Sequence, residues 1–174
     1  MKTEVRTNWR GDLSDSPACA DLSPAELEVL LAIGGTRVLE PGDVLFTEGE
    51  WGHDLALLLE GQLLVETVQA GKLRELARVD APAVMGEIGL ALDAPRSATV
   101  RALCQARVFV LDGDELHRKV RSRSSAALGL VWNVLRLLSR RQLLLNRHLL
   151  KLLEAEEPRF DMREFAARLN EWAL

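Results

Sequence analysis

Short hydrophobic runs separated by turn residues fill the middle of the chain, from residue 36 to 111. Each run is about five to seven residues long, and Gly, Pro or Asp interrupts the chain roughly every ten residues. This spacing is typical of antiparallel strands in a sandwich or barrel. The predicted strands are TRVLE (36–40), VLFTE (44–48), LALLLE (55–60), QLLVETV (62–68), LRELARV (73–79), SATVRAL (97–103) and ARVFVLD (106–112).

Helices are predicted on both sides of the strands and once among them. Residues 86–92 are too small and Gly-rich for a strand and read as a helical turn between two strands. A helix begins at Ser23, because Glu26 follows at the spacing of a capping box and Pro24 fits the first helical position. This helix is expected to stop at Gly34–Gly35, and DELHRKVRS (114–122) predicts another short helix.

A long helix is predicted over residues 124–157, with two apolar stripes along it. One stripe has heptad spacing with a polar break at Gln142; the other lies beside it. A helix buried only against its own domain needs a single stripe, so two stripes favour homodimerisation. The first stripe is Leu128, Val131, Leu135, Leu138, Gln142, Leu145, Leu149 and Leu152, and the second is Leu130, Val134, Leu137 and Leu144.

The two ends of the chain are predicted to lie outside the main domain. Residues 1–22 are polar and broken by Gly11 and Pro17, which suggests a loosely ordered lead-in. Pro158 is expected to end the long helix, leaving residues 158–174 as a short helix or a tail. The predicted organisation is therefore a lead-in, a domain over 23–123, the helix over 124–157 and the terminal segment.

Charge and cysteine content narrow the class of protein. Residues 1–120 carry 12 Lys and Arg against 20 Asp and Glu, a net −8, whereas residues 121–174 carry 10 against 6, a net +4. The first residues contain no apolar signal segment, and no run approaches the ~20 apolar residues of a membrane span. Cys19 and Cys104 have no metal-like spacing, and free thiols in a reducing compartment are favoured over a disulfide. We expect a soluble cytoplasmic protein without a membrane partner.

The stretch GEIGLALDAPRSATVRA (86–102) carries the candidate chemistry. Gly86 and Gly89 allow close backbone approach, and the amides of a helical turn between them favour an anion. Arg96 supplies a planar fork of donors that suits a phosphate. Glu87 cannot be there for the phosphate, since like charges repel, but its carboxylate can accept a hydrogen bond from a sugar hydroxyl. A ribonucleoside cyclic phosphate meets both requirements.

The same residues resemble the phosphate-binding cassette of cyclic-nucleotide-binding domains. The pattern Gly-Glu-[Ile/Leu]-[Ala/Gly]-Leu followed by Pro-Arg-[Ser/Thr]-Ala-[Thr/Ser]-Val is filled at residues 86–90 and 95–100. Upstream, PGDVLFTEGEWGHDLALLLEGQLLVE (41–66) is similar to the first hairpins of that family. The likeness covers about residues 23–157 and is strongest to the sensory domain of bacterial catabolite-activator-type (Crp/Fnr) regulators. It implies a mainly β fold with flanking helices: an antiparallel, jelly-roll-like β-roll followed by a long dimerisation helix.

The resemblance also assigns roles to residues. It implies that Glu87 binds the ribose 2′-hydroxyl, while Arg96 and Ser97 bind the cyclic phosphate. Backbone amides near Ile88, Gly89 and Ala98 would complete the cradle that starts at Gly86. Cyclic AMP is favoured over cyclic GMP because the bacterial relatives use it.

Recognition of the base is less well determined by the sequence. The regulators contact the purine through polar residues partway along the long helix, and Ser139-Arg140-Arg141-Gln142 stands in that region here. The adjacent hydroxyl pair expected for adenine is missing. Gln142 is the best candidate for contacting the base, but a polar residue at a seam position also sets coiled-coil register. The two interpretations stay open.

The chain departs from the regulators at its end. Only 17 residues follow Glu157, too few for the helix-turn-helix domain that the regulators carry there, so specific DNA binding is not expected. The basic side chains of the long helix are better explained as a solvated face than as phosphate contacts. They are Arg136, Arg140, Arg141, Arg147 and Lys151.

No motif predicts an enzyme or a metal site. His53, His117 and His148 fall in a loop, a short helix and the long helix, with no nucleophile near them in sequence. We therefore expect a non-catalytic cyclic-nucleotide sensor, a homodimer that acts on a protein effector the sequence does not name. The alternatives are a dimeric scaffold with an idle pocket and the sensory part of a transcription regulator.

Overall fold

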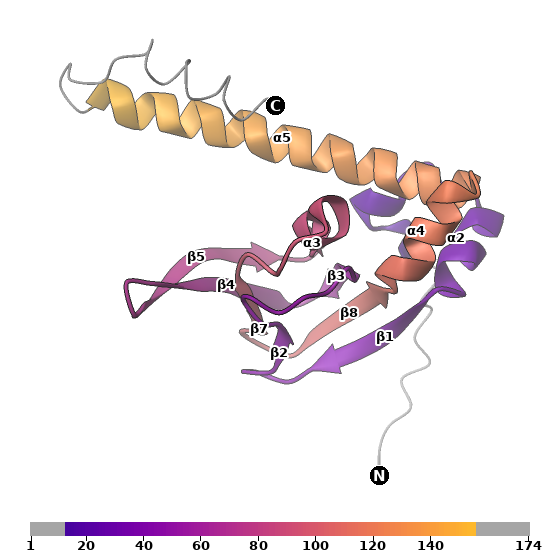
Figure 1. Cartoon of the computed structure of the whole chain (residues 1–174), viewed down its shortest axis with the longest axis horizontal. Helices are drawn as coiled ribbons and strands as arrows, with labels where there is room; N and C mark the ends of the chain where they lie inside the picture. The colour runs from indigo at the N-terminus through magenta and orange to yellow at the C-terminus, as the bar shows by residue number, and fades with distance from the viewer. Residues whose placement is uncertain (1–12, 156–174) are drawn as a thin grey trace. The chain divides into compact units, whose positions relative to one another are not determined.

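The computed structural model describes residues 13–155, in which eight strands form two four-stranded sheets (Figure 1). The sheets have the strand orders β1-β8-β3-β6 and β2-β7-β4-β5, and all neighbouring strands are antiparallel. A long helix, α5 (Ser125–Ala155), follows the strands, and the expected β-roll is confirmed. The strands are β1 (Gly34–Leu39), β2 (Val44–Phe46), β3 (Leu55–Glu60), β4 (Gln62–Gln69), β5 (Lys72–Asp80), β6 (Ala83–Met85), β7 (Thr99–Ala102) and β8 (Ala106–Leu111).

The predicted strands all coincide with observed ones, but two local predictions were wrong. Gly34 and Gly35 do not end the preceding helix, which stops at Leu31; they begin β1. The sequence analysis also missed β6, whose three residues follow a Pro and are too few to show alternation. This strand pairs with β3 at the edge of the first sheet and leads directly into the cassette.

The hydrophobic core lies between the two sheets, because its buried residues come from both of them. Leu58 and Val108 of the first sheet and Leu63 of the second have no exposed surface. The cluster also includes Met85, which directly precedes the cassette, and Val100, which is its last residue. The core therefore fixes both ends of the stretch that the sequence marked as the candidate site. The core members are Leu39, Leu45, Phe46, Ala56, Leu58, Leu63, Ala83, Met85, Val100, Ala102, Ala106 and Val108.

Side-chain caps define the starts of two helices. In α2 (Pro24–Leu31) the Ser23 hydroxyl accepts from the Glu26 amide at 3.4 Å. The Glu26 carboxylate in turn accepts from the Ser23 amide at 2.9 Å, which confirms the predicted capping box. In α4 (Gly113–Arg121) the Asp112 carboxylate accepts from the Glu115 amide at 2.9 Å. These caps fix where both helices begin, and the cap of α4 lies directly after β8.

The predicted loose lead-in is wrong for its described part. A 3-10 turn, η1 (Pro17–Cys19), places Leu13, Ala18 and Cys19 in buried positions with at most 2% exposure. The Asn133 side chain donates to the carbonyl of Ala18 at 3.2 Å and to that of Ala20 at 2.7 Å. The polar composition of residues 1–22 hid this packing, because the buried apolar side chains are scattered among polar ones. Residues 1–12 lie outside the described part.

The residues of helix α5 (Ser125–Ala155) belong to two compact units: those up to Leu135 to the first and those from Arg136 to the second. Within the first unit, Leu130 and Val134 of the second predicted stripe are buried. Leu128, Val131 and Leu135 of the first predicted stripe are 39–50% exposed. One stripe of this helix segment thus packs on its own domain and the other stays accessible. The predicted segment 158–174 lies outside the described residues.

None of the helices within residues 13–155 has the length and apolarity that crossing a membrane requires. Cys19 and Cys104 are both free thiols, the first buried and the second exposed.

Candidate functional site

The chain enters the cassette through a glycine. Gly86 follows β6 and caps α3 (Glu87–Leu92) with a φ of 89°, in the left-handed region. A Cβ at this position would lie 2.5 Å from the Asp54 carbonyl oxygen and 2.8 Å from Nη1 of Arg96. Both the backbone conformation and the available space therefore require glycine, and α3 starts directly beside the Arg96 side chain.

Backbone hydrogen bonds hold the segment after α3 against the loop between β2 and β3. The Arg96 amide donates to the Glu50 carbonyl at 2.8 Å, and the Gly49 amide donates to the Arg96 carbonyl at 2.8 Å. Gly49 and Glu50 thus oppose the single residue Arg96, and Gly49 has a φ of 81°, which is the pattern of a β-bulge with glycine in its first position. This pairing directs the Arg96 side chain inward, where only 7% of the residue is exposed.

Aromatic and backbone groups surround the Arg96 guanidinium. Its Cζ lies 3.8 Å from the centroid of the Phe46 ring, and Nη1 donates to the Gly86 carbonyl at 3.3 Å. A Cβ at Gly52 would lie 3.2 Å from Nη2, and a Cβ at Gly89 would lie 3.1 Å from Nη1. Glycine at these positions thus leaves the room that the guanidinium occupies. Because a guanidinium has five N–H donors, the bond to Gly86 uses only one of them.

Burial and two nearby carboxylates act in opposite directions on the pKa of Arg96. Burial lowers the pKa of Arg96, while the nearby charges of Asp54 and Glu87 act in the opposite direction and raise it. Arginine nevertheless keeps its charge in proteins. A fixed cation with limited access to water attracts an anion more strongly than an exposed one does.

The structure brings most of the predicted binding residues to this cation. Gly86 and Gly89 border the guanidinium, and Glu87 lies at the first position of α3, half-buried and near enough to influence its charge. The candidate carboxylate and the candidate phosphate ligand, nine positions apart in the sequence, are therefore neighbours in space.

The remaining predicted residues lie at the edge of this group. Ile88 is 43% exposed on α3, and Ser97 is exposed next to Arg96. Ala98 is buried, with 9% of the residue exposed, and directly precedes β7. An amide-rich helical turn, a guanidinium, a hydroxyl and a carboxylate together suit an anion that carries a hydroxyl group.

Sequence reasoning missed three residues of the arrangement: Phe46, Gly52 and Asp54. They contact or charge-balance Arg96 from β2 and the β2–β3 loop, 42 to 50 positions earlier in the chain. No local motif joins them to Arg96; the antiparallel pairing of β2 with β7 brings them together. The resemblance of residues 41–66 to the first hairpins of the family includes these positions but does not indicate their role.

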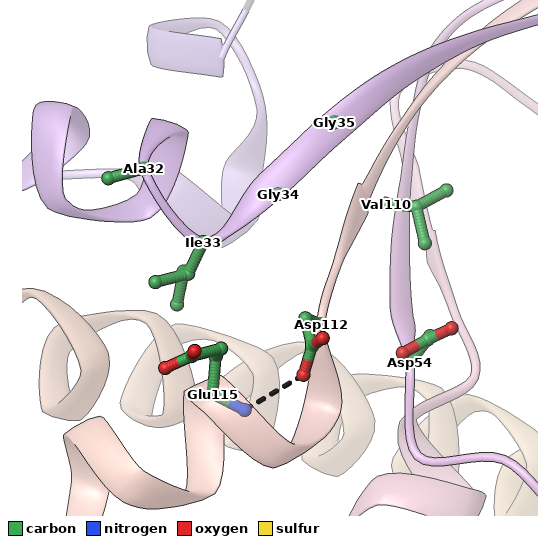
Figure 2. Close-up of a pocket in the computed structure, with 8 residues that line it drawn as sticks. All are labelled: Ala32, Ile33, Gly34, Gly35, Asp54, Val110, Asp112 and Glu115. Atoms are coloured by element: carbon green, nitrogen blue, oxygen red, sulfur yellow. Dashed lines mark hydrogen bonds between the residues drawn. The ribbon is translucent and has the colours of Figure 1, made fainter.

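A separate groove of about 440 Å³ lies between α2, β1, β8 and the start of α4, shown in Figure 2. Asp54, Asp112 and Glu115 contribute carboxylates to its lining. Asp112 caps α4, and Asp54 accepts from the Gly113 amide at 3.2 Å. The acidic lining disfavours a phosphate, and these two carboxylates already bind backbone amides.

Gln142 belongs to the second unit of the chain. Its side-chain amide donates to the side-chain oxygen Oδ1 of Asn146, one helical turn later, at 3.0 Å. A shallow depression of about 510 Å³ on α5 is lined by Leu138, Ser139, Gln142, Leu143 and Asn146. The cassette lies in the first unit, and a role of Gln142 in contacting the base stays a prediction.

Comparison with protein families decides the class of the domain. The family model described as "Cyclic nucleotide-binding domain" matches residues 36–123, which include every residue of the cassette. The chain belongs to the cyclic nucleotide-binding domain family. Within residues 13–155, no group of three or more His, Cys, Asp or Glu side chains is placed to hold a metal ion.

A curated relative of this cyclic nucleotide-binding domain is the "cAMP-dependent protein kinase regulatory subunit" of Yarrowia lipolytica. It is 32% identical over 113 residues, which is 65% of this chain and 30% of the relative. The chain thus spans less than a third of the length of that relative.

Solved structures agree on the fold of the domain. A cyclic nucleotide-binding domain from Methylobacillus flagellatus superposes with a TM-score of 0.74 at 22% identity, covering 88% of this chain and 87% of that one. The catabolite activator protein of Thermus thermophilus gives a TM-score of 0.66 at 25% identity, covering 79% of this chain and 63% of the other. The resemblance to catabolite-activator-type sensory domains is therefore confirmed.

Proposed function

We propose that the chain is a non-catalytic receptor for a cyclic nucleotide, in the first place cyclic AMP, and that the cassette around Arg96 binds it. The observation that carries this function is the guanidinium held beside the first turn of α3, with Glu87 next to it. The name of the yeast relative supports cyclic AMP over cyclic GMP. Arg96 and Ser97 bind the cyclic phosphate, and Glu87 accepts from the ribose 2′-hydroxyl.

Binding acts on the rest of the protein by a population shift. The ligand favours one placement of α5 and thereby changes a homodimer or the surface offered to an effector protein in the cytoplasm. The exposed stripe of α5 supports this part of the proposal, because a packed helix without a partner needs only its buried stripe.

Calorimetric titration with cyclic AMP, cyclic GMP and the linear nucleotide 5′-AMP tests the proposal. We expect cyclic AMP to bind and Arg96→Leu to abolish binding. Arg74→Leu is the matched control, because Arg74 is exposed on β5 and lies outside the cassette. Circular dichroism shows whether Arg96→Leu still folds, which matters because its side chain packs on Phe46.

Ser97→Ala provides a second variant that does not threaten the fold, since Ser97 is exposed. Loss of one hydrogen bond to a charged group corresponds to about 1.5–3 kcal/mol. We expect a correspondingly weaker affinity for cyclic AMP in this variant.

A scaffold with an idle pocket is the second candidate function, and the low exposure of Arg96, 7%, is the observation that favours it. It predicts no heat of binding and no thermal stabilisation with any of the three nucleotides. Such a result from the folded wild-type protein would overturn the proposed receptor function.

A further inference from the structure

A histidine connects the end of the cassette helix to α4. The His53 ring nitrogen Nε2 lies 2.7 Å from the Asp93 carboxylate, and Nδ1 lies 3.3 Å from the Asp114 carboxylate. We call these three residues the His53 bridge. Its members come from three parts of the domain: the β2–β3 loop, the C-cap of α3 and the first turn of α4.

The His53 bridge lies close in the chain to the groups that hold Arg96. His53 follows Gly52, whose Cα faces the Arg96 guanidinium. Asp93, with a φ of 49°, ends α3 and begins the segment that returns to Arg96. Displacing Asp93 therefore moves one end of the segment that positions the guanidinium.

The geometry requires a particular charge state of His53. Both ring nitrogens face carboxylate oxygens, which only accept hydrogen bonds when ionised. A neutral imidazole has one N–H donor, and its other nitrogen would present a lone pair to a carboxylate. Only the imidazolium satisfies both contacts.

A second histidine supports the same end of α3. Nε2 of His117 on α4 lies 2.9 Å from the Leu90 carbonyl, within the last turn of α3, where carbonyl groups lack helical partners. This contact needs a single N–H, which a neutral ring provides. The two imidazole rings are 6.0 Å apart, so His117 also faces His53.

The charged groups around His53 are mostly acidic. Asp93 faces it from α3 and Asp114 from α4, while Asp54 of its own loop accepts from the Gly113 amide. The hydrogen bond to Asp93, and then that to Asp114, raises the pKa of His53 above its usual value of 6.5. The contribution of the bridge is therefore fully present below that value and is lost as the pH rises through the higher pKa of the folded protein.

We propose that protonated His53 is a positioning residue for the nucleotide site, holding the C-terminal end of α3 against α4 so that the Arg96 segment is preorganised. Deprotonation weakens this link and with it the affinity for the cyclic nucleotide. The proposal rests on the proposed receptor function and adds to it a dependence on pH near neutrality.

The charge of His53 is measured first, without nucleotide. The chain has three histidines, so their imidazole resonances can be followed by nuclear magnetic resonance across pH and assigned with His53→Gln. We expect the midpoint for His53 to lie above 6.5 and to fall in the double variant Asp93→Asn/Asp114→Asn. An ordinary or lower midpoint, unchanged in the double variant, would overturn the proposal.

Affinity for cyclic AMP is then measured at about pH 6 and about pH 8.5, on either side of the histidine range. We expect the wild type to bind more weakly at the higher pH, by up to about tenfold, the factor that corresponds to one pKa unit. His53→Gln should show the same affinity at both values. His148→Gln, on an exposed position of α5, is the matched control and should keep the dependence.

The outcomes separate the two proposals. Equal wild-type affinity at both pH values, or a dependence that His53→Gln retains, contradicts the positioning role while leaving the receptor function intact. Asp114→Asn, at an exposed carboxylate, gives a second test should His53→Gln unfold, and it should also flatten the dependence. Absence of binding at both pH values contradicts the receptor function, and the positioning role falls with it even where His53 shows a raised pKa.

Discussion

At the scale of single residues, Gly89 has almost no room for a side chain. A Cβ there would lie 2.6 Å from the Gly52 carbonyl oxygen and 3.1 Å from Nη1 of Arg96, and the first of these atoms belongs to the backbone. We expect Gly89→Ala to lower the free energy of unfolding by about 1–3 kcal/mol, the usual cost of overpacking. It should also weaken cyclic AMP binding, because Gly52 and Arg96 must move.

Urea unfolding of Gly89→Ala and of Gly35→Ala provides the comparison. A Cβ at Gly35 meets no atom within 4 Å, so this variant controls for the loss of a glycine as such. Unfolding of both variants at the same urea concentration as the wild type would contradict the crowding of the Gly89 site.

The two thiols differ sharply in their surroundings. Burial raises the pKa of the Cys19 thiol to about 12, whereas Cys104 is exposed. Because the thiolate is the reactive form, we expect Cys104 to react with a thiol-specific disulfide reagent within minutes at neutral pH and Cys19 only after unfolding. Mass spectrometry of the labelled protein identifies the site. Labelling of Cys19 in the folded protein would show that the segment 13–22 opens from the domain.

At the scale of elements, Glu48 joins the end of β2 to two other strands. Its carboxylate accepts from the Thr67 hydroxyl at 2.6 Å and from the Val68 amide at 2.9 Å, while its own amide donates to the Thr99 hydroxyl at 3.1 Å. The hydrogen bond from Thr67, and then that from Val68, lowers the pKa of Glu48 below its ordinary 4.5. The ionised form therefore stabilises the native state, and its protonation weakens it.

The pH dependence of unfolding tests this link. The contribution of Glu48 is present above about pH 4.5, the ordinary value, and is lost as the pH falls through the lower pKa of the folded protein. We expect Glu48→Gln to be less stable than the wild type at neutral pH and the difference to shrink in acid. Glu50→Gln, at an exposed position two residues later in the same loop, is the control. A difference that stays constant down to strongly acidic pH would contradict the link.

Elements also show how far the sequence predicts this structure. The capping box of α2 and most strands depend on residues within a few positions of one another, so local pattern was sufficient to predict them. The proximity of Glu87 to Arg96 could be predicted for the same reason, since only eight residues separate them in the chain. Phe46 and Asp54 reach Arg96 only through the pairing of β2 with β7, and His53 reaches α4 only through the fold. Contacts between residues so far apart in the chain produce no characteristic spacing that a sequence motif could reveal.

At the scale of the whole molecule, the exposed face of α5 is the surface through which we expect the chain to form a dimer. Leu128, Val131, Trp132 and Leu135 are 39–62% exposed and form this face within the first unit. Full burial of one such side chain contributes roughly 1.5–3 kcal/mol, and half-exposed side chains gain about half of that. Four per copy therefore approach, but do not clearly exceed, an association cost of about 4–15 kcal/mol.

This comparison implies that a dimer depends on apolar side chains along much of α5, where Leu143, Leu144, Leu145 and Leu150 of the second unit are also exposed. We expect the wild type to sediment as a dimer and the double variant Val131→Lys/Leu135→Lys to sediment as a monomer. Each copy of the variant would bury two lysine charges, so the two-fold interface would contain four like charges. Leu73→Lys is the matched control: its side chain is 64% exposed on β5, so the substitution removes exposed apolar surface without touching the helix. A wild type that is monomeric with and without cyclic AMP would remove homodimerisation from the mechanism, and the population shift would then have to act on the surface that α5 offers to another protein.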